Sequence, residues 1–207
     1  MVNRTSQMDG GAEGDPPEGH RWLKVNGVVV GTVPITGDPE TDLIVAREFL
    51  DKRGLRPPPP TKVQSMFRQA IAFATVSRDC HAMLNRQPRN PVYAAPFVVN
   101  IAFSIELYLK TLAEAHGVTP WGHDLMKLYE GLPGAALAAL SKVTPHAAQS
   151  EGLAETSDVG DVLANLRTAF VDWRYVYEKE STEMVHIPNA IFVARALHEA
   201  CLASGIK

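Results

Sequence analysis

The sequence predicts an all-α protein, an up-and-down bundle of about five helices preceded by a small strand-strand-helix module. The first observation is an apolar stripe at the three- and four-residue spacing of a helix face: Val98, Ala102, Ile105, Leu109 and Leu112. The second is a heptad seam, which suits packing against a neighbouring helix: Val159, Leu163, Leu166, Phe170, Trp173 and Tyr177. The third is that short connections containing proline or glycine separate the helical stretches, as they do between antiparallel neighbours.

Four parts are expected along the chain. They are a disordered tail at 1–20, a module at 21–55, a linker at 56–60 and the helical bundle at 61–207. The tail is rich in Gly, Asp, Glu and Pro and has too few large apolar side chains to offset the entropy of ordering. The linker, RPPPP, is expected to be stiff and extended.

The module combines a hairpin with one helix. Asn26-Gly27 separates two apolar runs, and this dipeptide is favoured in tight hairpin turns. A helix is expected to begin at Asp38, as its cap, and to end at Gly54. The hairpin could cover the main domain or offer an exposed sheet edge to a partner.

The bundle is expected to contain five main helical stretches. They run from Thr61 to about Arg86, from Pro96 to Gly117, from Gly134 to Pro145, from Asp158 to about Glu180, and from Pro188 onward. Pro145 is expected to end the third helix, because proline cannot donate the next backbone hydrogen bond.

Composition is that of a soluble globular protein. The chain has 207 residues, of which 45% are hydrophobic and 21% charged. Its net charge of −3 gives no global electrostatic reason to bind nucleic acid, although it is compatible with a local basic patch. Cys80 and Cys201 lack the paired spacing of a metal or redox motif, so we expect two buried, small hydrophobic residues.

Several classes of function have no signal in the sequence. There is no clustered Asp or His set with metal spacing, no phosphate-binding glycine loop and no nucleophile elbow, so neither a metal nor a cofactor is predicted. Neither a signal peptide nor a run of about 18 apolar residues is recognisable. We therefore expect a cytoplasmic protein that does not interact with a membrane.

Chemistry-bearing residues gather around the second helix of the bundle. Glu106 and Lys110 lie one helical turn apart and predict an ion pair, at the surface or partly buried. His123 follows in a loop and could act as an acid, a base or a ligand, while Asp124 is placed to cap the next helix. In the alternative interpretation these residues only start a helix, and the His123 ring packs on Trp121.

A second candidate group ends the heptad helix. Arg174 could pair with Glu178 or contact a phosphate, because a guanidinium group suits phosphate geometry. Beside it, Tyr175 and Tyr177 could provide a stacking surface for single-stranded RNA. Aromatic packing alone would also explain them, and Tyr177 belongs to the apolar seam.

Two further pairs of basic residues share a helix face. Arg78 precedes His81 by three positions, and Arg195 precedes His198 by the same spacing. We expect both pairs to lie at the surface or at the edge of the bundle.

Three separated segments, SIELYLKTL, GHDLMKLYEGL and AFVDWRYVYE, together resemble the HEPN domain (higher eukaryotes and prokaryotes nucleotide-binding). The resemblance covers roughly residues 61–205 and is closest to the bacterial branch with a Glu/Lys helix, a Gly-His-Asp-Leu loop and a terminal Arg-Tyr-x-Tyr-Glu. It implies an all-helical homodimer with a site at or near the dimer interface. Many members are metal-independent ribonucleases of toxin-antitoxin or phage-defence systems, and others bind nucleotides or assist a partner.

One departure from the family pattern affects the expected activity. The ribonuclease branch carries an Arg and a His about four to six positions apart, whereas Arg195 reaches His198 too soon and Arg174 has no His before His186. The resemblance therefore implies a dimer that binds RNA or a nucleotide, with an antitoxin or another protein as a further partner. Two alternatives stay open: an endoribonuclease with His123 as acid-base and Arg174 stabilising phosphate charge, or a structural interaction module. For the dimer that binds RNA or a nucleotide, the implied ligand-binding residues are Glu106, Lys110, Asp124, Tyr175, Tyr177 and Glu178.

Overall fold

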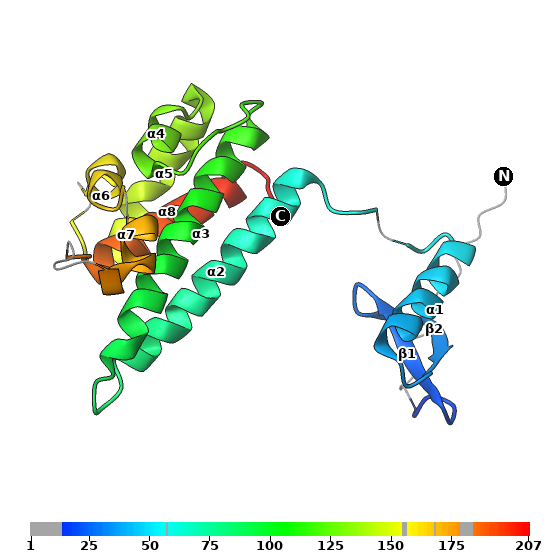
Figure 1. Ribbon diagram of the computed structural model, residues 1–207. Coiled ribbons are helices and arrows are strands. Elements are labelled where there is room, and N and C mark those ends of the chain that lie inside the picture. The colour runs from blue at the N-terminus through cyan, green and yellow to red at the C-terminus, as the bar shows by residue number, and fades with distance from the viewer. Residues whose placement is uncertain (1–13, 57, 155–156, 168, 179–183) are drawn as a thin grey trace. The chain divides into compact units, whose positions relative to one another are not determined.

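A computed structural model describes residues 14–56, 58–154, 157–167, 169–178 and 184–207. The chain divides into two compact units, an N-terminal unit, Met1–Pro59, and a C-terminal unit, Pro60–Lys207. The division falls inside the proline run. The described part of the chain is mainly helical, with eight α-helices and a small two-stranded antiparallel sheet near the N-terminus (Figure 1).

The N-terminal unit is a hairpin followed by one helix. Its elements are β1 (His20–Val25), β2 (Val28–Pro34) and α1 (Pro39–Lys52). Asn26 and Gly27 both have positive φ, 51° and 82°, as the predicted tight turn requires. Asp38 caps α1 by accepting a hydrogen bond from the Thr41 amide, which confirms the predicted helix start. β1 begins at His20, within the stretch predicted as tail.

Phe49 packs α1 onto the hairpin at a glycine. A side-chain carbon at Gly31, where φ is +154°, would overlap the Phe49 ring. The Arg53 guanidinium lies 4.3 Å from the centre of the same ring and donates to the Val30 carbonyl oxygen at 2.9 Å. Gly31 is thus required for the close approach of the aromatic ring to the strand.

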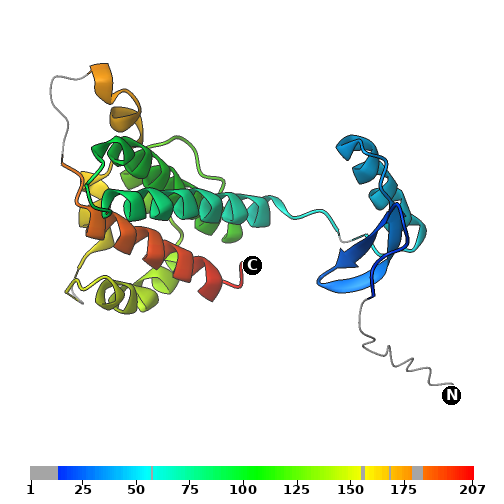
Figure 2. The ribbon, with the colours of Figure 1, turned by 90° about the horizontal axis from the view of Figure 1, so that it is seen from below.

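The C-terminal unit is built on two long neighbouring helices, α2 (Lys62–Leu84) and α3 (Ala94–Ala115), and its remaining elements cover them. Its helices are α2 (Lys62–Leu84), η1 (Pro91–Tyr93), α3 (Ala94–Ala115), α4 (Leu125–Glu130), α5 (Gly134–Ser150), α6 (Val159–Asn165), α7 (Ala169–Arg174), η2 (Val176–Glu178) and α8 (Ile187–Ala203). Figure 2 shows α8 with α2 and α3 on one side and α5 on the other. Among the described residues this unit has more helices than the five predicted.

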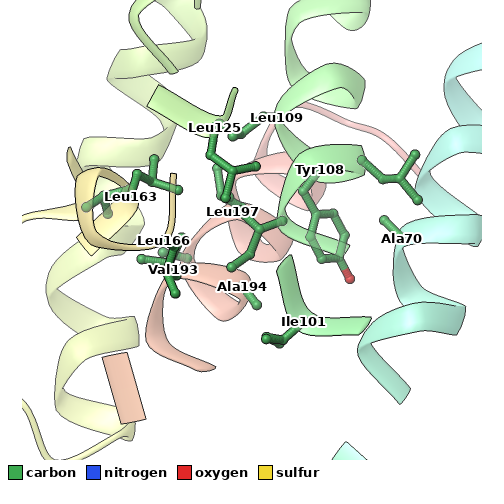
Figure 3. Close-up of a cluster of buried hydrophobic side chains, with 14 of the residues drawn as sticks. Ala70, Ile101, Tyr108, Leu109, Leu125, Leu163, Leu166, Val193, Ala194 and Leu197 are labelled. Carbon is green, nitrogen blue, oxygen red and sulfur yellow. The ribbon is translucent and has the colours of Figure 1, made fainter. Parts of the chain in front are cut away.

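The core is a single apolar cluster to which α3 contributes most. All five residues of the predicted α3 stripe are buried, which confirms that prediction. Figure 3 shows apolar side chains from α2, α3, α4, α6 and α8 meeting in one cluster, among them Ala70, Ile101, Leu125, Leu163 and Leu197. Cys80 and Cys201 are buried free thiols, as predicted.

The α3 region is as long and as apolar as a membrane-crossing helix. Within the described residues, Pro91–Ala115 has the length and the mean hydropathy, 1.6, of a membrane-crossing helix. However, 56% of that apolar stretch is buried inside the unit, which fits the core helix of a soluble protein. The cytoplasmic location stays a prediction.

The predicted continuous helix from Asp158 to about residue 180 is wrong in its described part. α6 ends at Asn165, whose side chain donates to the backbone carbonyl oxygen of Asp161, and a new helix, α7, begins at Ala169. The first three seam residues are buried, but Tyr177 is 77% exposed and lies outside the core. The break lets the later part of the seam turn towards α3 instead of continuing along one line.

The prediction that Pro145 ends a helix is also wrong. α5 continues through it to Ser150. Ala147 and Ala148 on the next turn are fully buried, so their packing offsets the one backbone hydrogen bond that proline cannot donate.

Gly31→Ala should destabilise the N-terminal unit by about 1–3 kcal/mol, because the new methyl group has to displace the Phe49 ring. Amide hydrogen exchange measured by NMR should show faster exchange in β1 and β2. Gly14→Ala is the control, since a side-chain carbon there meets nothing within 4 Å. Unchanged protection in Gly31→Ala would show that Phe49 does not lie on this strand.

Candidate functional site

Glu106 is a charged residue in the middle of the core. It lies on α3 and is only 1% exposed. Its Oε1 accepts hydrogen bonds from Lys110 Nζ at 2.8 Å and from His123 Nδ1 at 2.9 Å. Lys110 is 18% exposed, whereas His123 is 70% exposed. One buried oxygen therefore holds both a cation on the same helix and an exposed imidazole on the following loop.

Within the described part of the chain, the other carboxylate oxygen of Glu106 has no such hydrogen-bond donor. Oε2 is buried and has no hydrogen-bond partner among the described residues. Burying a carboxylate oxygen without a partner costs free energy, so such atoms are rare in folded proteins and call for an explanation. The carboxylate thus keeps one unused acceptor next to the groups that it positions.

The end of α3 determines where His123 lies. Gly117, with φ of 82°, takes the left-handed conformation, and the Val118 amide donates to the Ala113 carbonyl oxygen at 3.0 Å. This hydrogen-bond pattern turns the chain sharply off the helix axis. A second left-handed glycine, Gly122 with φ of 87°, then precedes His123. The loop therefore returns towards α3, where His123 meets Glu106.

Asp124 fixes the other side of the loop. It caps α4 by accepting hydrogen bonds from the Met126 and Lys127 amides, as predicted. Its other oxygen, Oδ2, lies 2.7 Å from Nε and 2.6 Å from Nη2 of Arg167, which follows the end of α6. The hydrogen bond from Arg167 is the largest effect on the pKa of Asp124 and lowers it, while the same contact raises the pKa of Arg167. Asp124 thus joins α4 to the α6–α7 connection.

Two exposed side chains lie near His123 in the sequence. Trp121, two residues before His123, is 94% exposed, and Lys127 on α4 is also exposed. Within the described residues, Trp121 has no ring contact with His123. The alternative in which the histidine packs on the tryptophan therefore does not describe this loop. We call Glu106, Lys110, Trp121, His123, Asp124 and Arg167 the loop site.

The second predicted group forms a separate cluster at the end of α7. The Arg174 guanidinium lies 4.7 Å from the Tyr175 ring centre and 5.5 Å from that of Phe170, and it donates to the Tyr175 hydroxyl. Phe170 stacks on Phe103 of α3, with centroids 5.2 Å apart. Among the described contacts, Arg174 forms no ion pair with Glu178, which is exposed like Tyr177.

The structure brings together four of the eight predicted residues. Glu106, Lys110, His123 and Asp124 meet at the loop site, and no described contact links Arg174 to any of them. The arginine that reaches this corner is Arg167. The sequence offers no local signal for its pairing with Asp124, 43 positions away.

The loop site has the elements of proton transfer. A carboxylate that accepts from Nδ1 requires the hydrogen on that nitrogen, so the neutral ring presents Nε2 as a base. The described residues contain no group of three His, Cys, Asp or Glu side chains that could hold a metal ion.

Comparisons with known proteins find no matching family model, no similar curated protein and no similar solved structure. The resemblance to HEPN domains therefore depends on the three sequence segments alone and remains a hypothesis.

Glu106→Ala should lower the free energy of unfolding by roughly 1–4 kcal/mol, because Lys110 loses its partner in a largely buried position. Chemical denaturation followed by circular dichroism measures this loss. The matched control is Glu48→Ala, which removes an i,i+4 partner of Lys52 where both side chains are more than half exposed. That change should cost less than about 0.5 kcal/mol. Equal losses in the two variants would mean that Glu106 is solvated.

Asp124→Asn should make stability less dependent on pH in acid. A carboxylate whose folded pKa is lowered stabilises the fold above its unfolded pKa, near 3.8, and this contribution is lost as the pH falls through the lower folded value. Thermal unfolding between neutral pH and strong acid should therefore show a steeper loss for the natural chain than for Asp124→Asn. Asp79→Asn serves as the control, because Asp79 is 70% exposed. Parallel curves for the natural chain and Asp124→Asn would contradict the Arg167 contact.

Proposed function

We propose that the C-terminal unit binds single-stranded RNA or a nucleotide at the loop site. The observation that carries this proposal is the buried Glu106 carboxylate, which holds His123 at 2.9 Å while 70% of the imidazole stays exposed. A buried charge that fixes an exposed polar ring is a costly arrangement for a purely structural loop. It is the arrangement expected where a ring has to meet a ligand in a set orientation.

The surroundings of His123 favour recognition by stacking more than by charge. Lys110 and Arg167 are paired with carboxylates, so their charges are largely compensated. Trp121 offers an almost fully exposed aromatic face, on which any nucleobase can stack. Lys127 adds a cation with no ion pair among the described contacts. We therefore expect a shallow salt dependence, with a slope corresponding to about one released counterion.

The wider biological expectations are part of the same proposal. In this account α2, α3, α5, α8 and the α6–α7 pair act as the five-helix bundle of a HEPN-like homodimer. The resemblance also suggests a bacterial defence or toxin-antitoxin context, with an antitoxin or other protein as partner.

Static light scattering at tens of micromolar tests the dimer, which a monomer mass would rule out.

The Glu106–His123 contact also favours a second function, metal-independent RNA cleavage. The Nε2 atom of His123 would accept the proton of a ribose hydroxyl. The resulting oxygen would attack the neighbouring phosphorus and form a cyclic phosphate, while the bond from that phosphorus to the 5′ oxygen of the next nucleotide breaks and this oxygen takes a proton from water. Two observations favour binding without cleavage. The chain lacks the arginine-to-histidine spacing of the ribonuclease branch, and Arg174 lies in the cluster at the end of α7 instead of at the loop site.

Trp121→Ala should weaken binding of a short oligouridylate by about 1–3 kcal/mol, the usual contribution of one stacked base. Fluorescence anisotropy of labelled RNA measures the affinity. Because the chain has three tryptophans, contact at Trp121 is reported by quenching of tryptophan emission that is lost in Trp121→Ala. Tyr177→Ala is the companion variant, because Tyr177 is 77% exposed in the other cluster. An effect of Tyr177→Ala alone would move the binding site to the end of α7.

His123→Ala separates binding from catalysis. Without cleavage, the change should reduce affinity by about 0.5–1.5 kcal/mol and leave background hydrolysis unaltered. His146→Ala is the matched control, since His146 is 72% exposed and contacts Glu199 through Nδ1 at 3.2 Å. RNA cleavage with chelator present that falls a hundredfold or so in His123→Ala, but not in His146→Ala, would establish the ribonuclease instead. If neither RNA nor uridine monophosphate binds at low salt, the binding proposal is wrong and the interaction-module hypothesis remains.

A further inference from the structure

A second site lies on the opposite side of α3. A cavity of about 460 Å³ opens between α2, α3 and α8. Much of its wall is apolar, formed by Ile71, Ala74, Phe97, Ile101, Ile191 and Ala194. A volume of several hundred Å³ with mainly apolar walls and a few polar groups is typical of small-molecule sites.

Both Arg-His pairs, expected at the surface or at the edge of the bundle, line this one cavity. Arg78 and His81 reach it from α2, and Arg195 and His198 reach it from α8. The spacing of three places each pair on one helix face, and the packing of the two helices brings the two faces to the same opening. Two histidines and two arginines thus converge around an apolar hollow.

The inner end of the cavity carries a fixed polar pair. The Tyr108 hydroxyl and His198 Nδ1 lie 3.1 Å apart, and the His198 ring stacks on Phe67 with a centroid distance of 5.3 Å. Burial lowers the pKa of His198, which favours its neutral ring. Among the described hydrogen bonds, Nε2 of His198 has no partner. The pair therefore offers hydrogen-bonding capacity to a ligand without adding a charge.

The charges at the cavity do not cancel. Arg195 is held by Glu151, whose Oε1 lies 2.6 Å from its Nη2, and this pair closes one side of the opening. Arg78 has only a 3.7 Å contact with Asp79, and both of these side chains are at least 70% exposed. The charge of Arg78 at the rim is therefore only weakly compensated.

We propose that this cavity binds a small monoanionic carboxylate with an apolar body. The apolar part lies against α3 and α8, the carboxylate meets Arg78 at the rim, and the Tyr108–His198 pair orients the inner end. The cavity is separate from the loop site, because none of its lining residues belongs to that site.

Hydrocinnamate is a suitable probe, with hydrocinnamyl alcohol and phenyl phosphate as its neutral and phosphoryl counterparts. Titration calorimetry of the full chain should show hydrocinnamate binding at least threefold more tightly than the alcohol. Arg78→Gln should remove that preference, weakening hydrocinnamate about three- to fivefold because an exposed cation is partly screened. Arg68→Gln is the control, an exposed arginine on α2 outside the cavity. Equal affinity for acid and alcohol would overturn the carboxylate assignment, and tighter binding of phenyl phosphate would replace it with a phosphoryl ligand.

Thr75→Phe tests the cavity itself, because Thr75 lines it and a larger ring would fill it. It should weaken hydrocinnamate at least tenfold while circular dichroism and unfolding stay close to those of the natural chain. If that variant fails to fold, perturbation of the His198 ring signals by hydrocinnamate in the natural chain takes its place. Unchanged affinity, unperturbed His198 signals or no binding of any probe would refute the proposal. A natural dimer that Thr75→Phe splits into monomers would show that a second copy fills the cavity.

Discussion

The buried carboxylate of Glu106 is the constraint on which the C-terminal unit depends. A charge in an apolar core is tolerated only with close partners, and here a single oxygen has two, Lys110 and His123. Lys110 satisfies the charge within the helix. His123 ties the following loop to the core, so the loop cannot move without leaving the carboxylate less well paired. The same contact gives the imidazole a defined orientation.

The rest of the unit supports this contact from both ends of the loop. The left-handed Gly117 turns the chain off α3, and Asp124 begins α4 while holding Arg167 from the next segment. Earlier in α3 than Glu106, Phe103 lies between Phe73 of α2 and Phe170 of α7, with centroid distances of 4.6 and 5.2 Å. These aromatic contacts fix the helices that surround the carboxylate.

α3 presents polar groups in two different directions. Positions two residues apart on a helix point about 200° apart, so Glu106 and Tyr108 face nearly opposite sides. Glu106 meets the loop, whereas Tyr108 meets His198 of α8 beside the cavity. One core helix therefore positions both the loop site and the cavity, and the apolar stripe between them provides the rigidity that each needs.

Local patterns predicted the elements well and their tertiary pairing poorly. The hairpin at Asn26-Gly27, the α3 stripe and the Asp124 cap each depend on neighbours within a few residues, and all are found. The single helix through Leu166 was wrong, because its apolar spacing is compatible with a break that lets Phe170 turn to Phe103.

The loop site was predicted in part for the same reason. Glu106 and Lys110 share a helix, so their pairing follows from spacing. The convergence of Arg167 on Asp124, and of Arg78 with Arg195 on one cavity, depends on how distant helices pack. No spacing within the sequence encodes those contacts.

The most direct test of the account is the tautomer of His123, observed through its ring nitrogens by NMR at a pH of about 8.5, where an ordinary histidine is neutral. Signals are assigned by comparison with His123→Ala. Donation from Nδ1 to Glu106 predicts a ring protonated on Nδ1, with Nε2 bare, and a change in this tautomer when Glu106 is replaced by Ala. A His123 ring protonated on Nε2 in the natural chain, as in a free imidazole side chain, would show that the buried carboxylate does not hold it.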